Sequence, residues 1–87
     1  MTFEVVLHED ASKALLAMDA SVRERLTKRI ARMRNEPPGR HMQHGFDFFV
    51  EEVGQYRLVY ACEGERKIIY FVGKHKEYEC WYSAGRK

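Results

Sequence analysis

Two runs of strand-forming residues flank a short polar segment in the second half of the chain. Residues 56–61 and 67–72 are rich in β-branched and aromatic side chains, and the segment 63–66 between them contains Gly64. This pattern is typical of a β-hairpin. Successive side chains of a strand point to opposite faces, so the first run predicts two sets of residues. Tyr56, Leu58 and Tyr60 share one face, and Arg57, Val59 and Ala61 share the other.

The first half of the chain predicts one strand and two helices. Residues 3–7 form a short, β-branched apolar run that favours a strand. Apolar residues then recur at helical spacing up to Met18, in a helix that begins near Asp10 or Ser12. Ser21, followed three residues later by Glu24, predicts a capping box at the start of a second helix. The apolar stripe of this helix is Val22, Leu26, Ile30 and Met33, and Pro37 and Pro38 end it.

A further strand is predicted over residues 46–53, after a loop at 38–45. Phe46, Phe48 and Val50 fall on one face of this strand, and Gly54 turns it into the hairpin. Residues 74–87 are polar and aromatic, and both a strand and a helix remain open there. The order strand, helix, helix, strand, strand, strand predicts an α+β fold. In this fold an αα-hairpin lies on one small sheet that contains a three-stranded antiparallel meander.

Chain length and composition place these elements in a single domain, residues 1–87. A chain of 87 residues buries about 60–65% of its unfolded surface, which is enough for one core. No apolar run reaches the roughly 20 residues that span a bilayer. The N-terminus lacks a basic region before an apolar stretch, as a signal peptide would have. We therefore expect a cytoplasmic protein with no membrane partner.

Basic residues are concentrated in two segments, although the net charge is only +2. Residues 21–35 hold six basic residues and one acidic residue, and residues 66–87 hold six and two. Clustered basic charge suits a polyanionic partner. For the helix, a solvated face is the competing interpretation.

Arg57 and His75 are the first candidates for catalytic or phosphate-binding residues. An arginine among apolar strand residues needs a partner, and two interpretations remain open. It forms an ion pair with Glu51 or Glu52, or it binds phosphate in a fork geometry. Pairing of the two hairpin strands would bring Lys74, His75 and Lys76 close to Arg57. A histidine between two lysines can exchange a proton near neutral pH and lies where an anion would be held.

The remaining aromatic, histidine and cysteine residues give weaker signals. Tyr78, Trp81 and Tyr82 suit either stacking on unpaired bases or packing on the sheet, and packing is favoured for Trp81. The remaining histidines, which show no ligand spacing and are predicted on the surface, are His8, His41 and His44. Cys62 and Cys80 are too few for a structural zinc site and are predicted to be buried free thiols. No metal or cofactor is expected.

Two segments resemble the RelE/ParE superfamily of toxin–antitoxin toxins. They are Gly-Gln-Tyr-Arg-Leu-Val-Tyr at 54–60 and Val-Gly-Lys-His-Lys at 72–76, with Tyr82 beyond them. The resemblance covers nearly the whole chain and implies a ribosome-dependent endoribonuclease, which cuts mRNA without a metal through attack by a 2′-hydroxyl. It also implies that Arg57 holds the scissile phosphate and that His75 protonates the leaving oxygen. Lys74 and Lys76 would bind RNA, and Tyr82 or Tyr78 would match the terminal tyrosine.

The chain departs from the family where strongly nucleolytic members carry basic residues. Residues 48–52 read Phe-Phe-Val-Glu-Glu, so a lysine base is absent there and Glu51 or Glu52 is the substitute. This departure favours two alternatives. One is a ParE-like inhibitor of DNA gyrase, and the other is a degenerate, non-toxic module that binds the antitoxin. All of these imply a cognate antitoxin protein as partner, and the nuclease implies the ribosome and mRNA.

Overall fold

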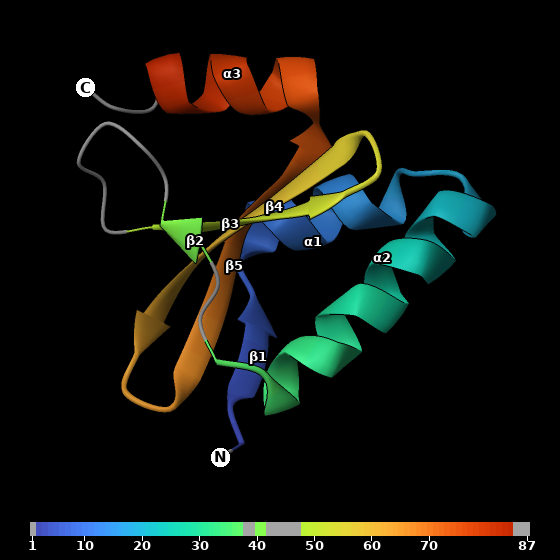
Figure 1. The fold of residues 1–87 in the computed structure, drawn as a ribbon. Coiled ribbons are helices and arrows are strands. Elements are labelled where there is room, and N and C mark those ends of the chain that lie inside the picture. Colours follow the sequence, from blue (N-terminus) through green and yellow to red (C-terminus); the bar gives the residue numbers. More distant parts are fainter. Residues whose placement is uncertain (1, 38–39, 42–47, 85–87) are drawn as a thin grey trace.

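The structure is a computed structural model that describes residues 2–37, 40–41 and 48–84, with the backbone alone described at 40–41 and 82–84. Figure 1 shows the order of the elements. They are β1 (Glu4–Leu7), α1 (Glu9–Leu16), α2 (Ala20–Arg32), the 3₁₀ helix η1 (Met33–Asn35), β2 (Arg40–His41), β3 (Phe49–Val53), β4 (Tyr56–Glu63), β5 (Arg66–Lys74) and α3 (His75–Ala84).

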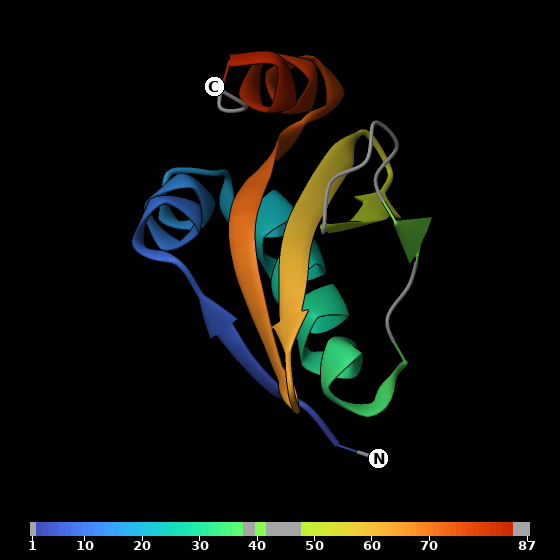
Figure 2. The ribbon, with the colours of Figure 1, turned by 90° about the vertical axis from the view of Figure 1, so that its left-hand side faces the viewer.

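The strands form one mixed sheet in the order β1-β5-β4-β3-β2. β3, β4 and β5 are the predicted antiparallel meander, and β1 pairs with β5 in parallel. The two-residue β2 adds to β3 at the far edge and was not predicted. Figure 2 shows α1 and α2 beside the sheet and α3 across one end of it. The predicted α+β architecture is confirmed, and residues 75–84, which the sequence left open, form a helix.

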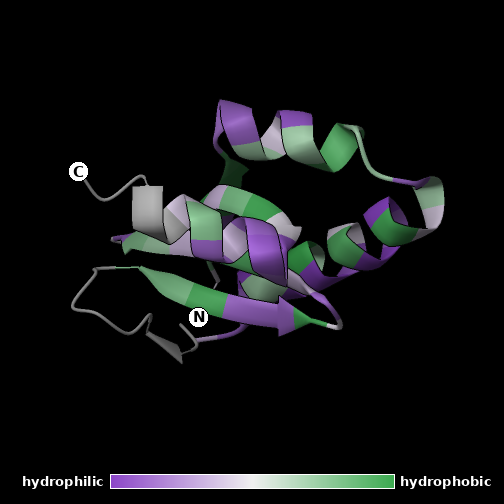
Figure 3. Cartoon of the chain, turned by 90° about the horizontal axis from the view of Figure 1, so that it is seen from above, coloured by the Kyte–Doolittle hydropathy of each residue, from purple (hydrophilic) through white to green (hydrophobic). Residues whose placement is uncertain are grey.

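A core on each face holds the helices to the sheet. The larger core joins the apolar stripe of α2 to β4 and β5, and its buried members include Leu26, Leu58 and Tyr60. Figure 3 shows apolar and polar residues alternating along the coils of α2, as an amphipathic helix requires. On the other face, Val50 and Val59 are covered by aromatic side chains, some of them from α3. The predicted assignment of alternate β4 residues to opposite faces is confirmed.

Two predicted boundaries differ from the structure. The capping box is wrong, because α2 already begins at Ala20 after the N-cap Asp19 and Ser21 lies in its first turn. The helix junction is instead bridged by Arg23, whose Nη1 donates to the carbonyls of Met18 and Leu16 at 3.1 and 3.4 Å. β3 begins at Phe49, and the predicted strand residue Phe46 lies outside the described residues.

Lys67 is a buried cation that ties the end of α2 to the sheet. Its side chain is 1% exposed, and Nζ donates to the carbonyls of Met33 and Glu36 at 2.8 and 2.7 Å. The ammonium also lies 4.6 Å from the ring centroid of Phe3 and 5.5 Å from that of Tyr60. Burial lowers the pKa of Lys67. The lysine therefore adds a donor to the Met33 carbonyl, which also accepts from the backbone N–H of Glu36, and supplies a donor to the Glu36 carbonyl at the end of η1.

The two cysteines differ in their exposure to solvent. Both thiols are free, but Cys80 is exposed, so the prediction of burial is wrong for this residue, while Cys62 is partly buried. Cys80 lies on a surface turn of α3, which the sequence had not identified as a helix.

Within the described residues, no helix combines the length and the apolar character needed to cross a bilayer.

Candidate active site

The β3–β4 turn, β4, the end of β5 and the start of α3 border an open cavity of about 470 Å³. Its lining consists of Gly54, Gln55, Arg57, Lys74, His75 and Lys76. The register explains this gathering, because Arg57 pairs with Gly73 across β4 and β5. The backbone N–H of His75 also donates to the carbonyl of Gln55 at 3.1 Å. The structure therefore brings together the strand arginine and the basic segment, as the sequence predicted.

Arg57 is held at the cavity wall by three oxygen atoms. Its side chain is 16% exposed, and Nε lies 3.8 Å from Oε2 of Glu52. Nη1 donates to the carbonyls of Tyr56 at 3.0 Å and Gly54 at 3.3 Å. Of the two ion-pair partners considered from the sequence, Glu52 is the one that the structure places beside Arg57. The guanidinium is thus fixed in position while it still lines the cavity.

Glu51 lies on the opposite face of β3 and serves a structural purpose. Its Oε1 accepts from Nη2 of Arg29 at 2.7 Å, and Nη1 of the same arginine donates to Glu36 at 2.9 Å. The hydrogen bond from Arg29 is the main cause that lowers the pKa of Glu36. This network fastens α2 to β3. Of the two glutamates weighed as a general base, Glu52 alone is next to Arg57.

His75 and the two lysines occupy the rim of the cavity. His75 Nε2 lies 3.0 Å from Oε2 of Glu79, one helical turn further along α3, and both side chains are 53% exposed. The backbone N–H of Lys74 donates to Oε1 of Glu77 at 2.8 Å, which caps the start of the helix. The side chains of Lys74 and Lys76 are exposed. Within the described part of the chain, no ion pair is recorded for either ammonium.

Gly73 permits the close approach of α3 to the sheet. A Cβ at this position would lie 2.7 Å from both Cζ of Phe71 and Oε1 of Glu77. Trp81 packs on Phe71 and Phe48, with ring centroids 5.6 and 5.7 Å apart. The predicted core packing of Trp81 is therefore confirmed.

Of the two tyrosines of α3, the side chain of Tyr78 is described and that of Tyr82 is not. Tyr78 is partly buried, with its ring 6.3 Å from Phe71 and 6.2 Å from His75. It therefore packs on the sheet and also borders the candidate site. Tyr82 belongs to α3 by its backbone, but its side chain lies outside the described residues, as do the side chains of His41 and His44. The third surface prediction, His8, is confirmed, since this residue is exposed.

Glu79 is the site residue that sequence reasoning missed. The signal was available, because Glu79 follows His75 at the i, i+4 spacing at which helical side chains meet. It was not used because the segment had not been assigned as a helix. In the described residues, no group of three or more His, Cys, Asp or Glu side chains is placed to hold a metal ion.

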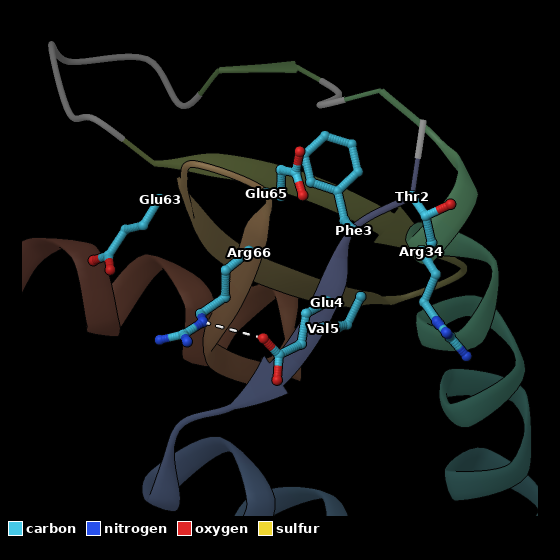
Figure 4. Close-up of a pocket in the computed structure, with 8 residues that line it drawn as sticks. All are labelled: Thr2, Phe3, Glu4, Val5, Arg34, Glu63, Glu65 and Arg66. Carbon is cyan, nitrogen blue, oxygen red and sulfur yellow. Dashed lines mark ion pairs between the residues drawn. The ribbon is translucent and has the colours of Figure 1, made fainter.

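A second cavity, of about 590 Å³, lies at the other end of the hairpin and contains no predicted site residue. Figure 4 shows the residues around it, which come from β1, the β4–β5 turn and η1. Arg66 Nε and Glu4 Oε1 lie 3.4 Å apart across its floor. The eight residues of β4 separate the two cavities, a strand length of about 23 Å. The candidate site is therefore confined to one end of the sheet.

Comparison with known proteins identifies the fold. No protein-family model and no curated protein matches the chain. The structure superposes on the Escherichia coli toxin RelE, in a free form with two arginines replaced by alanine. The TM-score is 0.79 and the identity 23%, over 99% of this chain and 97% of that one. The match to the toxin of the intact E. coli RelBE toxin–antitoxin complex has a TM-score of 0.69 and 26% identity, over 83% and 95% of the two chains.

A third solved structure extends the likeness to another organism. The Mycobacterium tuberculosis toxin–antitoxin complex RelBE2 matches with a TM-score of 0.72 and 17% identity, over 86% of this chain and 100% of that one. The chain therefore has the RelE toxin fold. The resemblance to the RelE/ParE superfamily that residues 54–60 and 72–76 indicated is confirmed for the fold.

Proposed function

We propose that this protein is the toxin of a type II toxin–antitoxin system and that it cleaves mRNA on the ribosome without a metal. The observation that carries the proposal is that Arg57 and the segment Lys74 to Lys76 line one cavity in a RelE-like fold. Three permanent cations around a cavity suit the negative charge of a phosphodiester.

The chemistry requires charge stabilisation, a general acid and a general base. The cavity lining holds candidates for the first two, and Glu52, beside Arg57, is the candidate for the third. The 2′-hydroxyl attacks the phosphorus, the 5′-oxygen leaves, and a 2′,3′-cyclic phosphate forms. Arg57 and the lysines stabilise the charge that develops on the phosphoryl oxygens. His75 gives a proton to the leaving 5′-oxygen, and Glu79 orients its imidazole at 3.0 Å. Tyr82 is proposed as a further catalytic residue, and Tyr78 as an RNA-binding residue.

Glu52 is the proposed general base. Its side chain is half exposed and lies beside Arg57, which places its carboxylate near the residue proposed to hold the scissile phosphate. Glu51 is excluded from this task, since it faces α2 and binds Arg29.

A RelB-type antitoxin is the proposed partner. The E. coli and M. tuberculosis structures to which this chain is similar are both toxin–antitoxin complexes. We propose that an antitoxin binds this chain in the same way and restrains its activity.

One observation favours a protein that binds without cutting. Arg57 is already engaged by Glu52 and by two carbonyls, and the acidic residues of β3 and α3 reduce the positive charge of the cavity. A toxin that inhibits gyrase, or an inert antitoxin-binding module, needs no available guanidinium. These functions form the second candidate.

The deciding experiment is primer extension on a cellular mRNA after brief induction of the wild type and of Arg57→Ala. The matched control is Arg66→Ala, which removes an arginine from the other end of the same hairpin. New ends within translated codons are expected with the wild type and the control, and not with Arg57→Ala. Full toxicity and cleavage in Arg57→Ala would refute the assignment. Intact message with arrested growth would favour gyrase, and normal growth would favour the inert module.

A further inference from the structure

Gly54 lies between two guanidiniums, one inside the candidate cavity and one outside it. Arg57 donates to the Gly54 carbonyl at 3.3 Å from within. Arg25, on α2, approaches the same glycine from outside, since a Cβ on Gly54 would lie 2.6 Å from Arg25 Nη2. Gly54 also has a φ of 60°, the left-handed region that glycine adopts readily. The β3–β4 turn therefore separates the two guanidiniums, with Arg57 on the side of the cavity and Arg25 on the side of α2.

Arg25 differs from the neighbouring cations of α2 in its surroundings. Arg29 binds two carboxylates, Arg23 binds two backbone carbonyls, and Lys28 lies near a carboxylate one turn away. Arg25 and Arg32 are exposed. Neither forms an ion pair or a hydrogen bond with another described residue, although the charge of Arg32 helps to lower the pKa of Glu36. The hydrogen-bond donors of these two guanidiniums can therefore bind an external anion.

The helix arranges Arg25 and Arg32 as a row that leads away from the cavity. They are seven residues apart, which places them on nearly the same face and about 10.5 Å apart along the axis. Figure 1 shows α2 running from the neighbourhood of the β3–β4 turn toward the other end of the sheet. The cations of the cavity, Arg25 and Arg32 thus follow one another along a line. Such an arrangement matches the regularly spaced phosphates of a nucleic-acid strand better than it matches a single anion.

We propose that Arg25 and Arg32 bind phosphates of an RNA strand that passes from the cavity over Gly54 and along α2. This inference rests on the proposed function, because the strand in the cavity is the RNA that is cleaved. The phosphates are therefore those of the message itself. The contacts are electrostatic and independent of base sequence.

The test compares two double variants that lose the same charge. Arg25→Ala/Arg32→Ala removes the row, and Lys13→Ala/Arg66→Ala removes two exposed cations that pair with Glu9 and Glu4 elsewhere. Affinity is measured from 50 to 200 mM KCl for two probes. One is a fluorescein-labelled, single-stranded RNA of twelve nucleotides with 2′-deoxy sugars at the cleavage site, and the other is 70S ribosomes programmed with an mRNA modified in the same way.

Each phosphate contact with single-stranded RNA contributes about 0.7 to the slope of log affinity against log salt. Loss of two contacts therefore lowers the slope by about 1.4, so that over this fourfold salt range the wild type loses about sevenfold more affinity than the variant. The control should keep the wild-type slope. A change with both probes supports the assignment to the message, and a change with ribosomes alone would overturn it in favour of ribosomal RNA.

An unchanged slope with both probes, or an equal change in the control, would overturn the inference. This failure is distinct from failure of the proposed function. If Arg57→Ala abolishes cleavage while the α2 variant binds like the wild type, the nuclease stands and the row on α2 has no part in RNA binding. If the wild type binds neither probe, both proposals fail. Thermal unfolding followed by circular dichroism confirms that both double variants are folded.

Discussion

Replacing Lys67 by methionine is expected to destabilise the protein by about 2–4 kcal/mol. The Lys67 side chain is 1% exposed, and its ammonium donates to two carbonyls at 2.8 and 2.7 Å. Hydrogen bonds from a charged donor contribute about 1.5–3 kcal/mol each, or about 3–6 kcal/mol for the pair. Methionine keeps a linear apolar side chain and avoids the desolvation of an ammonium, which offsets part of this loss.

Urea unfolding followed by circular dichroism measures this change in the free energy of unfolding. Unfolding entropy is about 2.1 cal/mol/K per residue, so for 87 residues the melting temperature should fall by about 11–22 °C. Lys13→Met, on the exposed side of α1, is the matched control and should change stability by less than about 0.5 kcal/mol. A loss of under about 1 kcal/mol in Lys67→Met would refute the structural role of the two hydrogen bonds.

The pH dependence of stability gives an independent check on the burial of Lys67. Burial lowers the pKa of Lys67 below its ordinary value of 10.5, so the unfolded state binds more protons than the folded state between the two values. The stability of the wild type therefore rises with pH through this window, relative to Lys67→Met. A difference between the two proteins that is constant or shrinks from pH 8 to pH 10 would contradict this reasoning.

Four further variants test the candidate site and its support. Glu52→Gln should lower single-turnover cleavage on programmed ribosomes by about 10²–10⁴-fold, the usual contribution of a general base; a rate within threefold of the wild type would exclude that role. His75→Ala should have an effect of similar size, and Glu79→Gln a smaller one, about tenfold, because Glu79 orients the imidazole. Equal losses in these two variants would contradict the division of roles. Because Arg29 lowers the pKa of Glu36 from 4.5, this carboxylate stabilises the folded state above that pH, and the stabilisation is lost as pH falls through the lowered value. Urea unfolding of Glu36→Gln between pH 6 and pH 3 should therefore show a weaker acid dependence than the wild type, and an identical dependence would refute the coupling.

The cavity could be anticipated because it is built on one hairpin. Residues 56–61 and 67–72 carry strand-forming side chains on both sides of a glycine-containing turn, and the register of a hairpin follows from its turn. The turn register alone would place Arg57 opposite Val72, and a bulge between Val59 and Tyr60 moves it by one residue to Gly73. In either register the residues that follow Gly73 emerge close to Arg57. A local pattern thus placed Arg57 near His75.

The choice between Glu51 and Glu52 could not be made in the same way. The two glutamates are adjacent in sequence and point to opposite faces of β3, so the outcome depends on which face α2 covers. Arg29 reaches Glu51 from α2 across a separation of 22 residues. The start of α2 was misplaced for a related reason, since the junction between the helices is stabilised by Arg23 rather than by a cap from Ser21.

Periodicity and turn chemistry act over a few residues, and they are sufficient to define the strands, the amphipathic helices and the hairpin of this chain. The partners of buried polar groups cannot be predicted from such local patterns, because they come from segments that are distant in the sequence. Lys67 meets carbonyls that are 31 and 34 residues away, and β1 pairs in parallel with a strand more than 60 residues further along the chain. Such contacts depend on how the elements pack against one another. A buried charge must be hydrogen-bonded or paired, and the groups that can do this are the ones that packing places next to it.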